Sequence, residues 1–195
     1  QRRLTITRAA RGLLGLAIQS ASARRRSASG APFGSSTAPS AEGPASVVPV
    51  DLDRLVAEVV ASLKPILGRH RIEVMPSVRL QPLADPPRLH QILEHLVENA
   101  VKYAPPDTAI RIDWRLQEGT VQVGVSDEGP GIPDEWRDRI FEPYARRDTH
   151  TARGSGIGLY AAKRLGESMG AHLWCEPASP HGARFVIALP AAVAV

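Results

Sequence analysis

The sequence predicts an α+β fold, a two-layer α/β sandwich in which three helices pack on one face of a mixed, mostly antiparallel sheet. Three segments repeat their apolar residues with the 3.6-residue period of a helix, and about five shorter segments have the character of strands. Turn signals between neighbouring strands favour hairpins, and this combination favours helices on one side of a sheet. A chain of 195 residues is long enough for one well-buried domain with a flanking segment.

The first 48 residues differ in composition from the rest. Residues 1–22 carry apolar side chains at three- and four-residue spacing, which is the stripe of an amphipathic helix that needs a partner. Residues 23–48 consist mostly of Ser, Ala, Gly, Pro and Arg, a composition that buries too little surface to offset the entropy lost on ordering. We predict a helix in 1–22, a flexible linker over 23–48 and an ordered domain over 49–192.

The domain is expected to begin with a helix, a short strand and a second helix. Asp51 is a candidate N-cap for a helix whose apolar spacing continues to Leu63. A strand follows at residues 72–75. Asp85 then precedes two prolines, and proline suits the first helical turn because its missing N–H would have no partner there. The periodic pattern of this second helix continues to Tyr103.

The second half of the domain is expected to alternate hairpin strands and helices. The sequence predicts strands at 109–116 and 120–127 around a Glu118-Gly119 turn, a short helix near 134–141, a polar loop, a helix from about 156 to 169 ended by Gly170, and strands at 172–176 and 184–189.

Composition excludes several classes of function. The net charge is +4, and the arginine run at 24–26 has no interleaved aromatic residues, so we expect no nucleic-acid partner. Cys175 is the only cysteine, which excludes an internal disulfide or a cysteine-rich metal site and suits a reducing cytoplasm. No apolar run reaches the roughly 20 residues of a membrane span, so we expect no membrane contact by this chain. Because it begins at Gln1, we expect a cytoplasmic fragment with room for a membrane anchor upstream.

The second predicted helix carries polar residues on the side opposite its core stripe. On a helical wheel, Gln91, His95, Glu98, Asn99 and Lys102 fall within about 100° of one another. A solvated surface is one interpretation. The other is a site that holds a hydrated Mg²⁺ and the phosphates it bridges, because Mg²⁺ prefers oxygen ligands and keeps several waters.

Asp127 begins a loop with Gly129 and Gly131 directly after an alternating strand. A carboxylate in this position can accept a hydrogen bond from the exocyclic amine of adenine. Guanine carries an acceptor there and would leave the acid unpaired. The alternative is an ordinary turn in which Asp and Gly serve the backbone geometry.

A second glycine cluster, residues 154–159, leads into the last predicted helix. Glycines at alternate positions let the backbone approach an anion closely, and the free amides and dipole of a helix start attract it. The pattern is not a dinucleotide-binding fingerprint, whose third glycine comes three residues after the second, and it lacks the Gly-Lys-Ser/Thr ending of a P-loop.

These three clusters, separated by about 28 and 27 residues, resemble in their order the N, G1 and G2 boxes of the GHKL ATPase superfamily. This superfamily contains gyrase, ATP-driven heat-shock chaperones, histidine kinases and the mismatch-repair protein MutL. Residues 140–146 resemble the F box of histidine kinases, and residues 181–185 with Leu189-Pro190 resemble the final G3 strand. The resemblance covers about residues 50–190 and implies the Bergerat ATP-binding fold.

The resemblance also implies roles for individual residues. Asn99 would ligate Mg²⁺, Asp127 would read adenine, and residues 144–153 would form a lid over the nucleotide. Glu98 would orient or deprotonate the attacking nitrogen, and Arg146 would stabilise charge during phosphoryl transfer. The implied ATP contacts are Asn99, Lys102, Tyr103, Asp127, Gly129, Gly131, Ile132, Gly154, Ser155, Gly156, Ile157, Gly158 and Leu159.

Several positions depart from the family pattern. His95 stands where kinases usually have Asn and the gyrase and chaperone branch has Glu, and both a bond to phosphate or water and a tolerated substitution are open. Glu128 replaces a frequent Asn, and Tyr144 replaces the second Phe of the F box. None of the six histidines lies in the phosphoacceptor pattern His-Glu/Asp-x-x-x-Pro.

By resemblance, the chain is expected to be the ATP-binding catalytic domain of a two-component sensor histidine kinase, with ATP and Mg²⁺ as cofactors. It would transfer the γ-phosphoryl group to a histidine on a dimerisation helix, for relay to a response regulator receiver domain. Residues 1–22 resemble the second helix of the dimerisation hairpin, so the acceptor would lie upstream in a homodimeric full-length protein. Two alternatives remain, an ATP-driven clamp of the gyrase or chaperone type and an ATP-sensing module without transfer.

Overall fold

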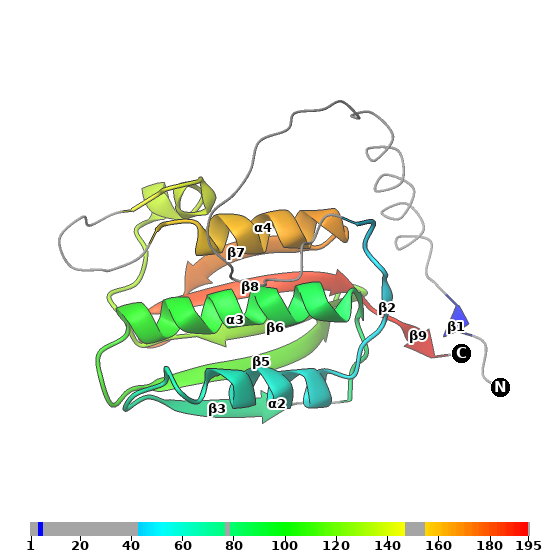
Figure 1. The fold of residues 1–195 in the computed structure, drawn as a ribbon, viewed down its shortest axis with the longest axis horizontal. Coiled ribbons are helices and arrows are strands. Elements are labelled where there is room, and N and C mark those ends of the chain that lie inside the picture. Colours follow the sequence, from blue (N-terminus) through cyan, green and yellow to red (C-terminus); the bar gives the residue numbers. More distant parts are fainter. Residues whose placement is uncertain (1–3, 6–42, 77–78, 147–154, 195) are drawn as a thin grey trace, which may run out of the picture.

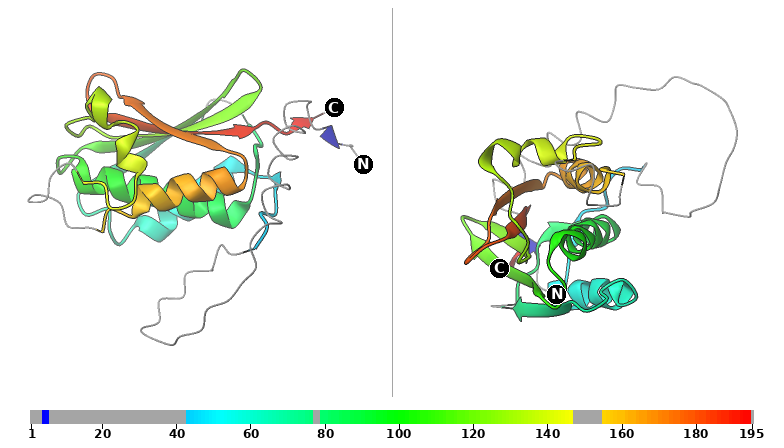
Figure 2. Two further views of the ribbon diagram at one scale, coloured as in Figure 1. Left: turned by 90° about the horizontal axis from the view of Figure 1, so that it is seen from above. Right: turned by 90° about the vertical axis from the view of Figure 1, so that its left-hand side faces the viewer.

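Three α-helices cover one face of a five-stranded sheet in the computed structural model, which describes residues 4–5, 43–76, 79–146 and 155–194 (Figure 1). The helices are α2 (Leu52–Leu63), α3 (Pro86–Tyr103) and α4 (Gly158–Ser168). The sheet contains, in spatial order, β3 (Arg71–Pro76), β5 (Ala109–Gln117), β6 (Thr120–Ser126), β8 (Ala183–Pro190) and β7 (His172–Pro177). The right-hand view of Figure 2 shows the helices end-on beside the sheet, which confirms the predicted two-layer sandwich.

The sheet is mixed and mostly antiparallel, as predicted. β3 pairs with β5 in parallel, whereas the pairs β5–β6, β6–β8 and β7–β8 are antiparallel. Glu118 and Gly119 join β5 to β6 with φ values of 50° and 77°. Two consecutive residues in the left-handed region give the turn that matches the twist of a two-residue hairpin.

The helix ends follow the signals in the sequence. Asp51 and Asp85 cap α2 and α3, each through a side-chain oxygen that accepts a hydrogen bond at 3.2 Å from the amide three residues later. Beyond α4, Gly170 has a φ of 74°, a conformation that carries no steric cost for glycine. The C-terminal end of α3 and the N-terminal end of α4 lie at the same end of the sheet, at the left in Figure 1.

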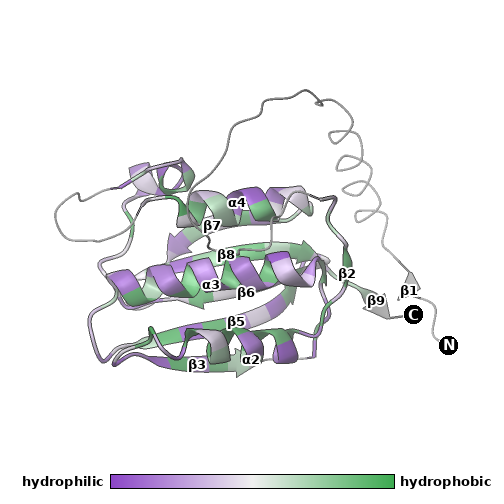
Figure 3. Ribbon diagram, viewed as in Figure 1, coloured by the Kyte–Doolittle hydropathy of each residue, from purple (hydrophilic) through white to green (hydrophobic). Residues whose placement is uncertain are grey.

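The core fills the space between the two layers. Leu96 of α3, Val123 of β6 and Phe185 of β8 are fully buried within it. Figure 3 shows hydrophilic residues along α3 and hydrophobic residues along β8 behind it. Cys175 packs in β7, as the sequence suggests, and burial raises the pKa of its thiol to about 12. Complete burial of an aliphatic or Phe side chain contributes about 1.5–3 kcal/mol, so this layer interface is the main source of stability.

The short helix predicted near 134–141 is instead a pair of 3-10 turns, η1 (Asp134–Trp136) and η2 (Arg139–Phe141). Few residues separate Pro133 from Pro143, and short segments commonly use this tighter helix. Phe141 is buried and packs edge-to-face against Phe185, with ring centroids 6.3 Å apart. This contact anchors the turns above the sheet.

The residues before α2 are attached to the domain at three points, one of which is the Arg88 guanidinium, which donates to the Gly43 carbonyl oxygen. β2 (Val48–Pro49) pairs antiparallel with β4 (Leu83–Ala84), and the Ser46 amide donates to Asp85 Oδ2 at 2.8 Å. Residues 43–48 of the predicted linker therefore lie against the folded core.

Only two residues of the predicted N-terminal helix are described. Leu4–Thr5 form strand β1, which pairs with β9 (Val193–Ala194), so at these two residues the helix prediction is wrong because their backbone extends to bond another strand. The remainder of 1–22, and 23–42, lies outside the described residues and stays a prediction. In the part of the chain that is described, no helix combines the length and apolar character of a membrane span.

Candidate functional site

Three stretches that are far apart in sequence converge on one cavity of about 690 Å³. Its volume lies within the usual range for small-molecule sites. The predicted site residues that line it are Glu98, Asn99, Lys102, Tyr103, Asp127, Gly131, Ile132, Arg146, Ser155, Gly156, Ile157, Gly158 and Leu159.

The polar stripe of α3 forms one wall of this cavity. The apolar stripe of the helix packs on the sheet, so the opposite stripe faces the cavity, which residues of α4 also line. His95 Nδ1 lies 3.6 Å from Glu98 Oε2, and the two side chains are 22% and 52% exposed. The Lys102 ammonium lies 4.8 Å from the centre of the Tyr103 ring. This wall thus presents an imidazole, an acid, an amide and an ammonium that solvent or a ligand can reach.

Asp127 is the most buried polar residue among those that line the cavity. It is 4% exposed, and burial raises the pKa of its carboxyl group, while hydrogen bonds from two backbone amides act in the opposite direction. Those amides belong to Gly129 and Ala183, which donate to Oδ1 at 2.8 and 3.4 Å. Because Oδ1 takes both bonds, Oδ2 is the atom left to accept from a ligand in the cavity.

Two glycines make this arrangement possible. A Cβ on Gly182 would lie 1.9 Å from the Asp127 carbonyl oxygen, and Gly182 has a φ of 104°. A Cβ on Gly129 would lie 2.8 Å from Asp127 Oδ1 and 3.0 Å from the carbonyl oxygen of Tyr103. Gly129 is not among the residues that line the cavity, but its lack of a side chain allows the Asp127 loop to approach the end of α3 closely.

The start of α4 forms the opposite wall. Its N-cap residue, Ile157, makes no side-chain capping bond, so the N-cap side chain satisfies none of the first amides of the helix. Gly156 has a φ of 71°, and its carbonyl accepts a hydrogen bond from the Tyr144 amide at 3.1 Å. A Cβ on Gly158 would lie 3.7 Å from His95 Nδ1. An uncapped helix start beside glycines suits a bound anion.

The predicted lid is described only at its beginning. Ala145 and Arg146 line the cavity, whereas residues 147–153 and the predicted ATP contact Gly154 lie outside the described residues. Within the described part of the chain, no three His, Cys, Asp or Glu side chains gather as a metal cage. A Mg²⁺ ion here would depend on Asn99, water and the oxygens of its ligand.

Sequence reasoning assigned no contact to six further lining residues, which are Pro130, Trp136, Ile140, Ala145, Ala161 and Ala183. Pro130, Ile140, Ala145 and Ala183 fall inside motifs that the sequence did identify, so those motifs held the signal. Trp136 and Ala161 belong to no motif. Only the packing of η1 and α4 against the cavity brings them there.

The family pattern described as "Histidine kinase-, DNA gyrase B-, and HSP90-like ATPase" matches residues 84–193. The chain is 32% identical over 151 residues to the sensor-like histidine kinase SenX3 of Mycobacterium tuberculosis, covering 74% of this chain and 36% of SenX3. It is 35% identical over 147 residues to the adaptive-response sensory kinase SasA of a Synechococcus species, covering 72% of this chain and 38% of SasA. The chain thus spans less than half the length of these relatives.

Two solved structures extend this similarity to the fold. A mycobacterial sensor histidine kinase, MprB, superposes with a TM-score of 0.66 at 25% identity, covering 75% of this chain and 98% of the other. Full-length ShkA in complex with AMPPNP superposes with a TM-score of 0.67 at 30% identity, covering 77% of this chain and 32% of ShkA. MprB is a sensor histidine kinase, and the ShkA structure carries a bound nucleotide analogue.

Proposed function

We propose that this chain, which belongs to the family of histidine kinase-, DNA gyrase B- and HSP90-like ATPases, is the ATP-binding catalytic domain of a sensor histidine kinase. The relatives named above are sensory kinases, and MprB is matched over almost its whole length. The observation that carries the proposal is the meeting of Asp127, the polar stripe of α3 and the uncapped start of α4 in one cavity.

Recognition of the base would fall to Asp127. Its free Oδ2 would accept the exocyclic amine of adenine, while the two backbone amides on Oδ1 hold the carboxylate in place. A hydrogen bond to a buried charged group is worth about 1.5–3 kcal/mol. Guanine would present a carbonyl oxygen to the same carboxylate, so the site would favour adenine.

The phosphates would lie between α3 and the start of α4. The free amides of α4 and the Lys102 ammonium would attract them, and the glycines at 156 and 158 leave room for close approach. Asn99 would offer a side-chain oxygen to Mg²⁺, which would neutralise charge on the phosphates when bound.

Transfer would require a histidine from outside this chain. Its ring nitrogen would attack the γ-phosphorus, the bond to the β-phosphate oxygen would break, and ADP would leave. Glu98 is half-exposed at the rim of the cavity, so it can orient the attacking ring or take its proton. Arg146 lines the same cavity and would stabilise the charge that develops.

The partners follow from this chemistry. The acceptor histidine would belong to the dimerisation helices of the same kinase, in a homodimer whose catalytic part lies in the cytoplasm. The phosphoryl group would then pass to the receiver domain of a response regulator. The histidine kinase ThkA has been solved in complex with a response regulator protein, TrrA.

A first test measures nucleotide binding through stability. Nucleotide at about 100 times its dissociation constant should stabilise the domain by about 2.7 kcal/mol, and Asn99→Ala should remove the part of this gain that depends on Mg²⁺. A melting temperature unchanged by ATP with Mg²⁺ would contradict the proposal.

A second test follows the γ-phosphoryl group. The chain would be incubated with γ-labelled ATP and a dimerisation hairpin supplied in trans, with Glu98→Gln as the variant that retains shape without basicity. Label on the hairpin histidine supports the kinase. Free phosphate would favour the ATP-driven clamp, and binding without either product would favour the ATP-sensing module.

A further inference from the structure

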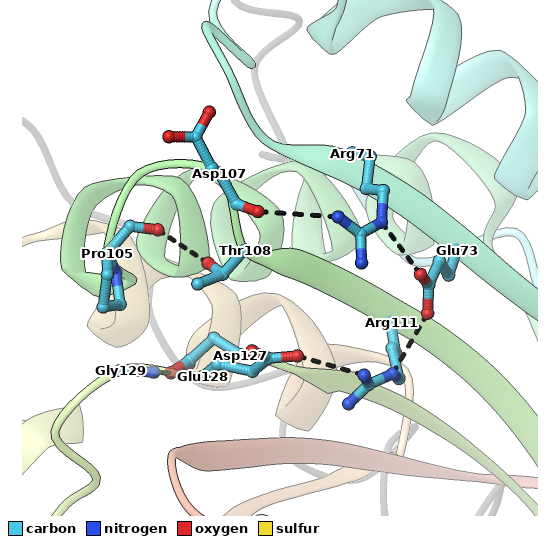
Figure 4. A network of polar contacts seen from close by, with 9 residues as sticks. All are labelled: Arg71, Glu73, Pro105, Asp107, Thr108, Arg111, Asp127, Glu128 and Gly129. Carbon is cyan, nitrogen blue, oxygen red and sulfur yellow. Dashed lines mark hydrogen bonds and ion pairs between the residues drawn. The ribbon is translucent and has the colours of Figure 1, made fainter.

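A chain of ion pairs on the outer face of the sheet connects the edge strand β3 to the loop that carries Asp127 (Figure 4). Arg111 of β5 stands at its centre. Its Nε atom lies 3.1 Å from Glu73 Oε2, and its Nη2 atom lies 3.0 Å from Glu128 Oε1. Arg71 Nε lies 3.1 Å from the other oxygen of Glu73. Ile110 and Ile112 face the core, so Arg111 between them faces away from the helices.

The same network reaches the turn that follows α3. Arg71 Nη1 donates to the Asp107 carbonyl oxygen at 3.5 Å, and Arg69 forms an ion pair with the Asp107 carboxylate. The Thr108 hydroxyl donates to the Pro105 carbonyl oxygen at 2.7 Å, which closes the turn. The network therefore contacts two chain segments next to the proposed adenine contact, the turn that follows α3 and the Asp127 loop.

Glu128 is the link between this surface network and the cavity. It directly follows Asp127, and its side chain is 24% exposed while that of Arg111 is 40% exposed. The two carboxylates diverge, with Asp127 bound to backbone amides inside and Glu128 bound to Arg111 outside. A shift of Glu128 would move the backbone that aims Asp127, because the two residues are consecutive and share a peptide bond.

Glu73 supports the same arrangement from β3. Hydrogen bonds from Arg71 and Arg111 lower the pKa of its carboxyl group, so it stays ionised and keeps Arg111 aligned between two acids. Arg111 thus has a fixed position set by both neighbouring carboxylates. An arginine bound on one side only would be freer to leave Glu128.

We propose that Arg111 is a positioning residue for base recognition, which acts through Glu128 to hold Asp127 where it meets the amine of adenine. The inference rests on the proposed nucleotide site. It assigns to the outer face of the sheet a part in selecting the base, although Arg111 does not touch the cavity.

The test compares two nucleotides that differ at the C6 and N1 edge of the base. Inosine triphosphate carries a carbonyl oxygen where ATP carries the amine, so it lacks the donor proposed to bond Asp127. The wild-type chain should bind Mg·ATP more tightly than Mg·ITP. In Arg111→Gln, we expect the affinity for ATP to fall about two- to fivefold, as for a partly exposed ion pair, with the affinity for ITP unchanged.

Four further variants sharpen the comparison. Arg115→Gln removes the same charge from the same face of β5, where Arg115 bonds only Gln122 among the contacts described, and should change neither affinity. Arg111→Lys keeps a cation between the two acids and should retain most of the ATP preference. Glu128→Gln should lower the affinity for ATP as much as Arg111→Gln does. The double variant should bind ATP no more weakly than either single variant, because both substitutions remove the same ion pair.

The outcomes separate the inference from the proposed function. An equal loss for both nucleotides in Arg111→Gln, or no loss for either, would overturn the positioning role while leaving the nucleotide site intact. Wild-type protein that binds neither nucleotide would overturn the proposed function together with the inference. Glu128→Gln keeps the shape of the side chain, so it decides the matter if Arg111→Gln does not fold.

Discussion

The two ends of the cavity are built by different means. At the base end, the carboxylate of Asp127 is buried, bonded to backbone amides and packed against Gly182 so closely that no side chain fits between them. At the phosphate end, partly exposed side chains of α3 face the uncapped start of α4. The fold itself therefore creates the end proposed for the base, whereas the end proposed for the phosphates offers groups that the fold does not need. Substitutions that disturb the close packing at the base end should lower stability, whereas substitutions at the phosphate end should affect binding alone.

Gly182→Ala should have the largest effect. The new Cβ would lie 1.9 Å from the Asp127 carbonyl oxygen at a φ of 104°, so either β8 or the Asp127 loop must move. Left-handed strain and overpacking each cost about 1–3 kcal/mol, so we expect a loss of about 3 kcal/mol or more in the free energy of unfolding, measured in urea. Gly68→Ala is the control, because Gly68 has a φ of 58° with open space around it. Equal losses of unfolding free energy in the two variants would contradict the argument that close packing around Gly182 forms the base end of the cavity.

Asp127→Asn should separate binding from folding. The amide oxygen can still accept from the two backbone amides, but the remaining atom becomes an NH₂ group, which would face the amine of adenine in the proposed complex. We expect ATP affinity to fall by about 1.5–3 kcal/mol, which is roughly 10- to 150-fold. The free energy of unfolding without nucleotide should hold or rise at neutral pH, because a buried charge is removed. Asp53→Asn, on the exposed side of α2, controls for the change in net charge.

The pH dependence of stability should report the same buried carboxyl group. Burial raises the pKa of Asp127 in the folded protein above its ordinary value of 3.8, so the folded state holds this proton more tightly than the unfolded state does. The contribution of this carboxyl group to the free energy of unfolding is complete at pH values below its pKa in the unfolded state. It is lost as the pH rises through its pKa in the folded state. The unfolding free energy of wild type relative to Asp127→Asn should therefore decline from about pH 3.5 upward and then level off. A difference that grows with pH would contradict the burial argument.

The sequence predicts the layers of this fold because its signals are local. Asp51, Asp85 and the Glu118-Gly119 turn each act within a few residues, and apolar periodicity assigns the helices to their faces. The close fit of Gly182 against Asp127 depends on residues 55 positions apart, and neither segment alone indicates that a Cβ at residue 182 would lie only 1.9 Å from the Asp127 carbonyl oxygen. Arg111 lies in none of the motifs found in the sequence. Its importance appears only when β3, β5 and the Asp127 loop are seen side by side.

Gly158→Ala should have the smallest effect on the fold and so sharpens the comparison from the other end. Its Cβ would make an ordinary contact 3.7 Å from His95 Nδ1, and alanine favours a helix over glycine by up to about 1 kcal/mol. Stability without nucleotide should therefore stay equal or increase by less than about 1 kcal/mol. Mg·ATP should bind about fivefold more weakly, because the methyl group would occupy part of the cavity through which we propose that phosphate reaches the amides of α4. Calorimetry and urea unfolding on the same variant measure both quantities. Loss of stability without loss of affinity would mean that this glycine serves the fold, as Gly182 does, and the difference between the two ends would disappear.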